Sequence, residues 1–502
     1  GWPLTIAMTP QKEPFFAGTY FPKNQIGQRP GMLQIIPSLA NAWSTKQIEI
    51  NESIKNIHDY LTRINASAIG DDWKESIVES AIRQFKNRFD SKHGGFSQAP
   101  KFPSAHNLIF LLRYSKLYND SKILKMVEKT LRKMREGGIF DQVGYGFHRY
   151  STDENWFLPH FEKMLYDQAM LSLAYLEAYH LTQNKDYAKV AEEIFQYVLG
   201  DLTHENGGFY SAEDADSEGI EGNFYIWKKK ELIDVLGEKN GEIIGKFYGF
   251  KKEGNYHDET THKTNGKNIP HIKMKFSELT ALTGMTEYEL ANLIEFSRKK
   301  LFEARKKKTR PMKDDKILTD WNGLMIASLA YGGQILNEIK YTDHAERAAY
   351  FIYKNLRKKN GRLLKSFRNE YADIPPHFDD YAYLIWGLLN LYESTFKLFY
   401  LSWSLDLANI MEMDFFDEKG GFFIGSKDSE KLIVRAKSGY DSAMPSGNSV
   451  AITNFFRLGK ITGDTRWITL SRKSLASFSE QAKNTPTGFA NMHTGFITHN
   501  NN

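Results

Sequence analysis

Four short segments of the sequence join carboxylates, amides or imidazoles to aromatic side chains: residues 155–162, 319–322, 377–381 and 440–448. Paired carboxylates can supply the proton donor and the base that glycosyl chemistry needs. A histidine beside an acidic or arginine side chain suits proton abstraction next to a carbonyl, as in sugar epimerisation. The pattern therefore favours chemistry on a carbohydrate-like ligand.

The candidate acid–base residues are ionisable side chains of three of these segments: Asp320, Asp379, Asp380, His160 and Glu162. An alternative stays open for each aspartate, because it stands where the N-cap acceptor of a helix belongs, and a cap needs no function. His160 has the corresponding alternative of a satisfied core histidine. The joint pattern favours a lined pocket, because Trp or Tyr accompanies the acids.

Aromatic rings and two loops complete the expected site. Trp156, Trp321 and Tyr381 would stack on a ligand ring. A glycine-containing loop at 138–150 and an acidic loop at 210–222 are expected at the same place. These loops and the fourth segment supply the remaining predicted ligand contacts: Asp141, His148, Arg149, Asp214, Asp216, Asp441 and Asn448.

The acidic loop imitates the first half of a calcium-binding loop, with Asp214, Asp216, Glu218 and Gly219. The twelfth position from Asp214 is Tyr225, whereas a calcium loop requires Glu there. We therefore predict no metal site, and we expect no cofactor.

The elements that must position these residues are helices of two kinds. Helices that are apolar nearly all round are expected at 161–181, 324–336, 381–392 and 449–458, and amphipathic helices alternate with them at 187–199, 342–356 and 465–481. A helix that is apolar on every side must be buried on every side, and an amphipathic one lies at the surface. The alternation predicts a mainly α fold, an (α/α)6 barrel with an inner and an outer ring. The N-terminal ends of the inner helices would converge on one mouth, where helix dipoles suit anions and hydroxyl groups.

Twelve helices would make the six hairpins of this barrel. They are expected near 71–90, 104–118, 120–136, 161–182, 184–202, 286–308, 321–339, 341–358, 379–397, 402–415, 446–463 and 464–482. A Gly-Gly phrase followed by bulky apolar residues recurs between helices, at 94–96, 137–140, 207–210 and 420–423. The recurrence indicates an internally repeated unit.

The first residues follow a different pattern. Apolar runs at 4–8 and 14–21 with a polar turn between them predict a β-hairpin, and helical spacing follows over 32–64. Two strands and a helix cannot enclose a complete core. We therefore expect two domains, a partial α/β unit at 1–66 and the barrel at 67–502.

Composition excludes several classes of function. The net charge of +5 is small and dispersed, which argues against nucleic-acid binding, and no stretch is apolar for long enough to span a membrane. Cysteine is absent, so thiol redox chemistry and thiolate metal sites are excluded for this chain. A cytoplasmic location is expected, and the sequence leaves the oligomeric state open.

The sequence resembles the thioredoxin-domain-containing proteins of the YyaL and spermatogenesis-associated type. The resemblance rests on residues 1–4, 14–22, 98–103, 137–150, 159–167, 213–222, 319–323 and 438–448. It implies a thioredoxin-like domain followed by a six-hairpin barrel similar to N-acylglucosamine 2-epimerases. Residues 1–22 would then be the last two thioredoxin strands, without the upstream redox cysteines. Family members continue beyond the region that matches 488–496, so barrel closure is expected to be incomplete.

Two functions remain as alternatives. In the first, the barrel is a sugar epimerase, isomerase or glycosidase-like protein that binds a small sugar-like ligand through carboxylate acid–base residues. In the second, it is a non-catalytic interaction module attached to a thioredoxin-like domain. The separation of the mouth carboxylates would discriminate between them, because glycosidase pairs lie about 5–10 Å apart.

Overall fold

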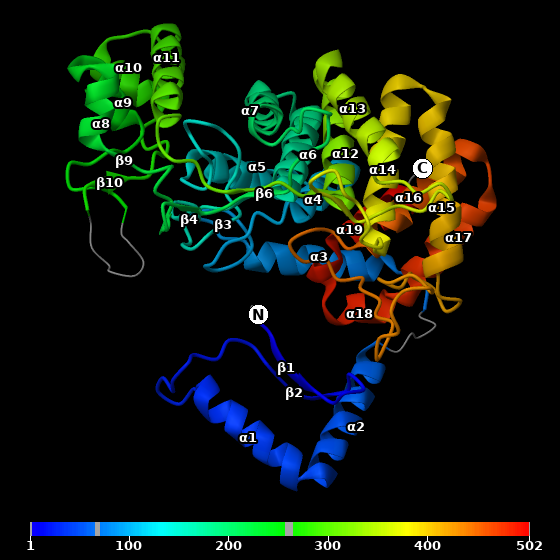
Figure 1. Ribbon diagram of the computed structural model, residues 1–502. Coiled ribbons are helices and arrows are strands. Elements are labelled where there is room, and N and C mark those ends of the chain that lie inside the picture. Colours follow the sequence, from blue (N-terminus) through cyan, green and yellow to red (C-terminus); the bar gives the residue numbers. More distant parts are fainter. Residues whose placement is uncertain (1–2, 66–70, 257–264, 501–502) are drawn as a thin grey trace.

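The computed structural model describes residues 3–65, 71–256 and 265–500. Its N-terminal unit contains β1 (Thr5–Met8) and β2 (Pro14–Gly18), which pair antiparallel with Thr5 opposite Gly18. Two helices follow, α1 (Met32–Thr45) and α2 (Gln47–Ile64), and α2 leads towards the larger helical part of the chain (Figure 1). The predicted hairpin is confirmed. The single helix expected over 32–64 is in fact two helices that meet at Lys46.

Many large apolar side chains of the N-terminal unit are exposed, including Ile6, Ile36 and Ile48. This unit therefore does not bury its apolar surface by itself, as its small size leads one to expect. The domain boundary expected at residues 66–67 falls at the edge of a stretch, 66–70, that lies outside the described residues.

Six inner helices form the centre of the remaining chain: α4 (Ala105–Tyr118), α6 (Leu165–Thr182), α12 (Thr319–Leu336), α14 (Phe378–Thr395), α16 (Gly447–Thr462) and α19 (Ala490–Asn500). Each packs against the next in this order, and α19 packs against α4. The ring of inner helices is therefore closed within the described residues, and the expectation of incomplete closure was wrong.

Six outer helices cover this ring: α3 (Glu75–Arg88), α5 (Ser121–Glu136), α7 (Lys185–Asp201), α13 (Ile339–Asn355), α15 (Leu398–Phe415) and α17 (Thr465–Ser477). Five inner helices pass to the next outer helix through only two residues, of which the first has a positive φ. A left-handed residue there ends each inner helix and reverses the chain. The connections from outer to inner helices are long, so the long loops all lie at the N-terminal ends of the inner helices.

Short strands lie in these long loops. They are β3 (Tyr150–Ser151), β4 (Pro159–His160), β5 (Lys163–Met164), β6 (Ala212–Glu213), β7 (Asp216–Ser217), β8 (Ile220–Glu221), β11 (Lys313–Asp314), β12 (Ile317–Leu318) and β13 (Ser366–Phe367). They pair as β3–β4, β5–β6–β11, β7–β8 and β12–β13. Helix α18 (Ser479–Asn484) and a 3-10 turn, Pro486–Phe489, precede α19.

The longest connection, between α7 and α12, carries a separate lobe. It contains α8 (Lys229–Leu236), α9 (Glu238–Phe247), α10 (Phe276–Thr283) and α11 (Glu287–Arg305), with β9 (Trp227–Lys228) paired to β10 (Lys267–Asn268). This lobe has its own apolar core and projects from one side of the barrel in Figure 1. The helix expected at 286–308 thus belongs to this lobe, and α19 takes the sixth inner position, which the sequence pattern missed.

One hydrogen-bonding device recurs at the starts of the inner helices. Gln168, Asn322 and Asn448 each hold the backbone of one phenylalanine in the preceding loop, accepting from its N–H at 2.7–2.8 Å and donating to its carbonyl at 2.7–3.0 Å. At the start of α14 the Tyr381 hydroxyl accepts from Leu363 N–H at 3.0 Å. Buried backbone groups need partners, so these clamps fasten each loop to its inner helix.

Helices α12 and α14 approach closely at Gly323, where a Cβ atom would lie 2.6 Å from the backbone of Tyr383 and Leu384. Backbone atoms at this contact cannot move aside. We expect Gly323→Ala to lower the free energy of unfolding by about 1–3 kcal/mol. Gly200→Ala in α7, where no atom lies within 4 Å, is the control and should be neutral or stabilising by up to about 1 kcal/mol. Chemical denaturation measures both, and equal stabilities of the two variants would contradict the close approach.

Candidate active site at the barrel mouth

The structure brings together three of the acids that the sequence singled out. Asp320 lies in the first turn of α12, and Asp379 and Asp380 lie in the first turn of α14. Asp380 Oδ1 accepts a hydrogen bond from the Asp320 N–H at 3.1 Å, so the two helix ends are joined directly. Asp380 is fully buried and Asp320 nearly so.

A lysine from a loop holds two of these acids. Lys365 Nζ contacts Asp320 Oδ2 and lies 3.1 Å from Asp380 Oδ1. Burial lowers the pKa of this ammonium, but its two carboxylate neighbours outweigh burial and raise it above the usual value. Burial raises the pKa of the Asp380 carboxyl, although Lys365 and the His377 N–H, 2.7 Å away, oppose that change. Lys365, Asp320 and Asp380 therefore form one ion-paired unit, the lysine triad.

Asp379 lies beside the triad, but among the described residues Lys365 is ion-paired with Asp320 and Asp380 and not with Asp379. Its side chain is partly exposed, and the Gly447 N–H donates to it. A Cβ at position 447 would lie 2.0 Å from Asp379 Oδ1, so glycine is what lets α16 approach this acid. Burial and the neighbouring Asp320 raise the pKa of Asp379 to about 6. Asp379 can thus exchange a proton near neutral pH.

His377 precedes α14 and is exposed. Burial of part of its ring and the nearby Lys365 ammonium lower its pKa, while Asp320 opposes the change. The imidazole is therefore neutral at pH 7. An acid with a raised pKa and a histidine with a lowered pKa at one place are the arrangement that acid–base catalysis uses.

A second ionic cluster lies on the β3–β4 hairpin and α6 side of the mouth. His160 lies 3.2 Å from Glu162 and 2.7 Å from Glu221, and these two hydrogen-bonded carboxylates raise its pKa to about 9. Arg149 is paired with Glu162 at 2.9 Å. His160 is consequently held as an imidazolium and is not available as a base.

Tyr166 and Trp321 connect the two clusters through an edge contact with ring centroids 4.9 Å apart. Beside them, Asp167 is buried, and its Oδ2 has no hydrogen-bond partner among the described residues. Burial raises the pKa of Asp167 well above the usual value, with Arg149 opposing. Trp321 keeps part of its ring exposed, as a stacking surface requires.

The Asp441 carboxylate accepts hydrogen bonds from the starts of two helices. It accepts from Ser446 N–H and Asn491 N–H, each at 2.8 Å, at the starts of α16 and α19. Burial raises its pKa to about 7 although these donors oppose the change. Together with Trp156 it lines a cavity of about 260 Å³ at the start of α4.

Several other predicted residues hold loops together. Asp141 is buried between Lys163 and Arg305, each at 2.8 Å, and His148 is buried with Nδ1 2.9 Å from the Phe161 carbonyl. Trp156 is buried and donates to the His93 carbonyl. Asn448 and Tyr381 form the backbone clamps described above.

Asp214 lies between β6 and β7, and Asp216 is the first residue of β7. Among the described residues, neither carboxylate is hydrogen-bonded to the lysine triad. Within the described residues, the Asp214 carboxylate accepts one hydrogen bond, from the Asp216 N–H at 3.1 Å. Within those same residues, no group of three or more His, Asp or Glu side chains is arranged to hold a metal ion.

Four residues of the mouth were not among the predicted site residues: Asp167, Glu221, Lys365 and His377. Lys365 lies in the loop between α13 and α14, and its partners lie 45 and 15 residues away, so spacing could not reveal it. Asp167 and His377 did carry a signal, because each lies in or next to the first turn of an inner helix, where the other acids were found.

The fold is that of the six-hairpin sugar-active enzymes. A crystal structure of D-mannose isomerase matches with a TM-score of 0.50 at 12% identity, covering 80% of this chain and 85% of that one. Cellobiose 2-epimerase from Spirochaeta thermophila matches with a TM-score of 0.50 at 13% identity, covering 81% and 85%. The GH76 α-mannanase BT2949 of Bacteroides thetaiotaomicron gives 0.50 at 11%, covering 85% and 97%. At these identities the likeness establishes the fold alone.

The chain belongs to the spermatogenesis-associated protein 20 family. The human protein of that name is 34% identical over 528 residues, which cover 98% of this chain and 67% of the human protein, and the rat protein is 33% identical over the same shares. An uncharacterised protein of Caenorhabditis elegans is 33% identical, covering 98% and 71%. A family model described as "Thioredox_DsbH: Protein of unknown function, DUF255" matches residues 1–62. Among the described residues, every helix is too short or too polar to cross a bilayer.

Removing the lysine of the triad should expose its electrostatic role. Lys365→Met leaves two buried carboxylates without their counter-charge, and we expect a loss of about 3–5 kcal/mol in the free energy of unfolding at pH 7. Lys316→Met removes a half-exposed lysine paired with Asp314 at 3.1 Å and should cost less than about 1 kcal/mol. Urea denaturation compares the two, and similar losses would contradict the triad.

The raised pKa of Asp379 predicts a pH dependence of stability. The folded protein holds this proton more tightly than the unfolded chain, so the stabilisation is present below about pH 4 and is lost as pH rises through about 6. Asp379→Asn keeps a neutral side chain at every pH. The variant should therefore gain about 1–3 kcal/mol relative to the parent between pH 4 and 8. Denaturation at several pH values tests this, with exposed Asp373→Asn as the control. A difference that stays constant with pH would refute it.

Proposed function

We propose that the barrel mouth binds a reducing sugar and moves a proton next to its carbonyl group, as an isomerase or epimerase does. Asp379 would be the acid and His377 the base. The observation that carries the proposal is the position of both residues at the start of α14, two residues apart and near Asp320 and Lys365, where burial raises the pKa of Asp379 to about 6 and lowers that of His377. Two groups at one site whose pKa values are shifted in opposite directions are typical of an acid–base pair.

The chemistry balances with these two groups alone. The neutral His377 ring accepts the proton from the carbon next to the carbonyl, and Asp379 gives its proton to the carbonyl oxygen, so that an enediol forms. Return of a proton to either carbon of the enediol gives the isomeric sugar or the epimer. Trp321, partly exposed beside Asp320, would stack on the sugar ring.

Glycoside hydrolysis is less well supported by this geometry. It needs one protonated and one free carboxylate on either side of the scissile bond. Asp320 and Asp380, the acids adjacent to Asp379, share the Lys365 ammonium. Asp380 also accepts from the backbone N–H groups of Asp320 and His377, and the Asp320 carboxylate accepts from that of Trp321. The proposal also draws on the solved structures of the same fold, two of which are described as a mannose isomerase and a cellobiose epimerase.

Solvent exchange tests the proposal without knowledge of the natural substrate. D-mannose, D-glucose and cellobiose are incubated with the protein in D2O, and deuterium entering at C2 is followed by NMR. We expect exchange with at least one sugar, about 10²–10⁴-fold slower in Asp379→Asn and in His377→Ala, and unchanged in the control Asp373→Asn. The rate should fall above about pH 6 as Asp379 loses its proton. Exchange at the parental rate in both site variants, or no exchange with any of these sugars, would overturn the assignment.

A further inference from the structure

A second cavity lies inside the ring of inner helices. Its volume is about 290 Å³, and all six inner helices contribute to its wall. Its residues on α14, Trp386, Asn390 and Glu393, follow Asp380 by six to thirteen residues, which corresponds to about 9–20 Å along a helix. The cavity, which we call the lumen site, does not include the residues of the lysine triad in its wall.

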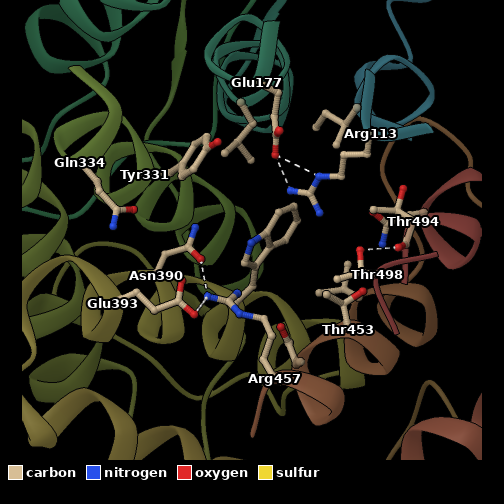
Figure 2. Close-up of a pocket in the computed structure, with 16 residues that line it drawn as sticks. Arg113, Glu177, Tyr331, Gln334, Asn390, Glu393, Thr453, Arg457, Thr494 and Thr498 are labelled. Atoms are coloured by element: carbon tan, nitrogen blue, oxygen red, sulfur yellow. Dashed lines mark hydrogen bonds and ion pairs between the residues drawn. The ribbon is translucent and has the colours of Figure 1, made fainter. Parts of the chain in front are cut away.

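Two ion pairs face each other across the lumen site (Figure 2). On one side Arg113 of α4 donates from Nε and Nη2 to Glu177 of α6, with the Nε bond at 3.1 Å. On the other side Arg457 of α16 lies 2.9 Å from Glu393 of α14 and donates to Asn390 at 2.9 Å. Glu177 and Arg457 are 13% and 18% exposed, whereas their partners Arg113 and Glu393 are 36% and 45% exposed.

Glu177 and Arg457 are largely removed from water, which is costly in a fold that needs only apolar contacts in its centre. Such burial is repaid only when the hydrogen bonds of the charged groups are satisfied, and apolar residues of similar size are often as stable. Much of the remaining wall is polar as well, including Gln334, Thr453 and Thr494. The paired charges and these neighbours therefore indicate a polar occupant of the lumen.

The charged and aromatic side chains that line the lumen site indicate which kind of ligand fits it. Each guanidinium is already matched by a carboxylate, so the site has no net charge to attract an ion. Each Arg–Glu pair presents donors beside acceptors, as neighbouring hydroxyl groups do. Trp386 adds an indole to the same wall, and an indole offers a flat apolar face. The volume, about 290 Å³, lies just below the range of about 300–1,000 Å³ that is usual for ligand sites, which suits a ligand of one ring.

We propose that the lumen site binds a neutral monosaccharide, held by the Arg113–Glu177 and Arg457–Glu393 pairs with its ring against Trp386. This is a binding site, distinct from the acid–base pair at the mouth and independent of the activity proposed there.

Calorimetry and tryptophan fluorescence of the whole chain test the proposal, with D-glucose, D-mannose and D-galactose as probes. We expect at least one of them to bind with a Kd of about 1 mM or lower and to change the tryptophan emission. Trp386→Phe should lose the spectral change and weaken binding about 5-fold or more, and Glu393→Gln should weaken it without affecting the fold, as circular dichroism would verify. Asp379→Asn, at the mouth, should keep this binding.

Three outcomes would overturn the proposal. The first is that none of the three sugars binds at concentrations up to about 100 mM. The second is that binding is lost in Asp379→Asn but kept in both Trp386→Phe and Glu393→Gln, which would place it at the mouth alone. The third is that glycine or L-alanine, in which a carboxylate and an ammonium could engage the two ion pairs, binds through these residues while the sugars do not.

Discussion

Six parallel helices that begin at one end of a barrel bring their unpaired N–H groups to that end, and the rest of the mouth is built around satisfying them. Asp380 accepts from two backbone N–H groups, those of His377 and Asp320. Asp441 accepts from the starts of α16 and α19. These acids are therefore structural caps first, and for Asp380 the Lys365 ammonium supplies a counter-charge.

The same constraint explains which parts of the fold could be predicted from the sequence. Inner helices are buried on all sides, so their apolar composition predicted four of the six, α6, α12, α14 and α16, while α4 was expected only as a helix. Helix α19 escaped because it is short and carries His, Thr and Asn, although it is buried as deeply as the others. Helix α11 was mistaken for a barrel helix because a charged, amphipathic pattern looks the same on an outer ring and on a separate lobe.

The site was only partly predictable, for a reason that lies in the hydrogen bonds. Asp320, Asp379 and Asp380 look alike in sequence, each beside an aromatic residue at a helix start. Only the partners distinguish them, because Asp320 and Asp380 face Lys365 while Asp379 faces the Gly447 backbone. Asn448 and Tyr381, expected on a ligand, instead hold backbone N–H groups, a role that depends on loops folding back from a distance in the chain.

The charges of the triad also affect the acid that we propose as the proton donor, Asp379. One ammonium serves two carboxylates in the triad, and a third negative charge beside them is unfavourable because no further cation offsets it in this unit. Burial is the main cause of the raised pKa of Asp379, and the Asp320 charge adds to it while Lys365 opposes it. The acid strength of Asp379 thus depends on its burial and on two members of the triad, so the needs of the fold and the proton donor proposed for the mouth meet in one cluster.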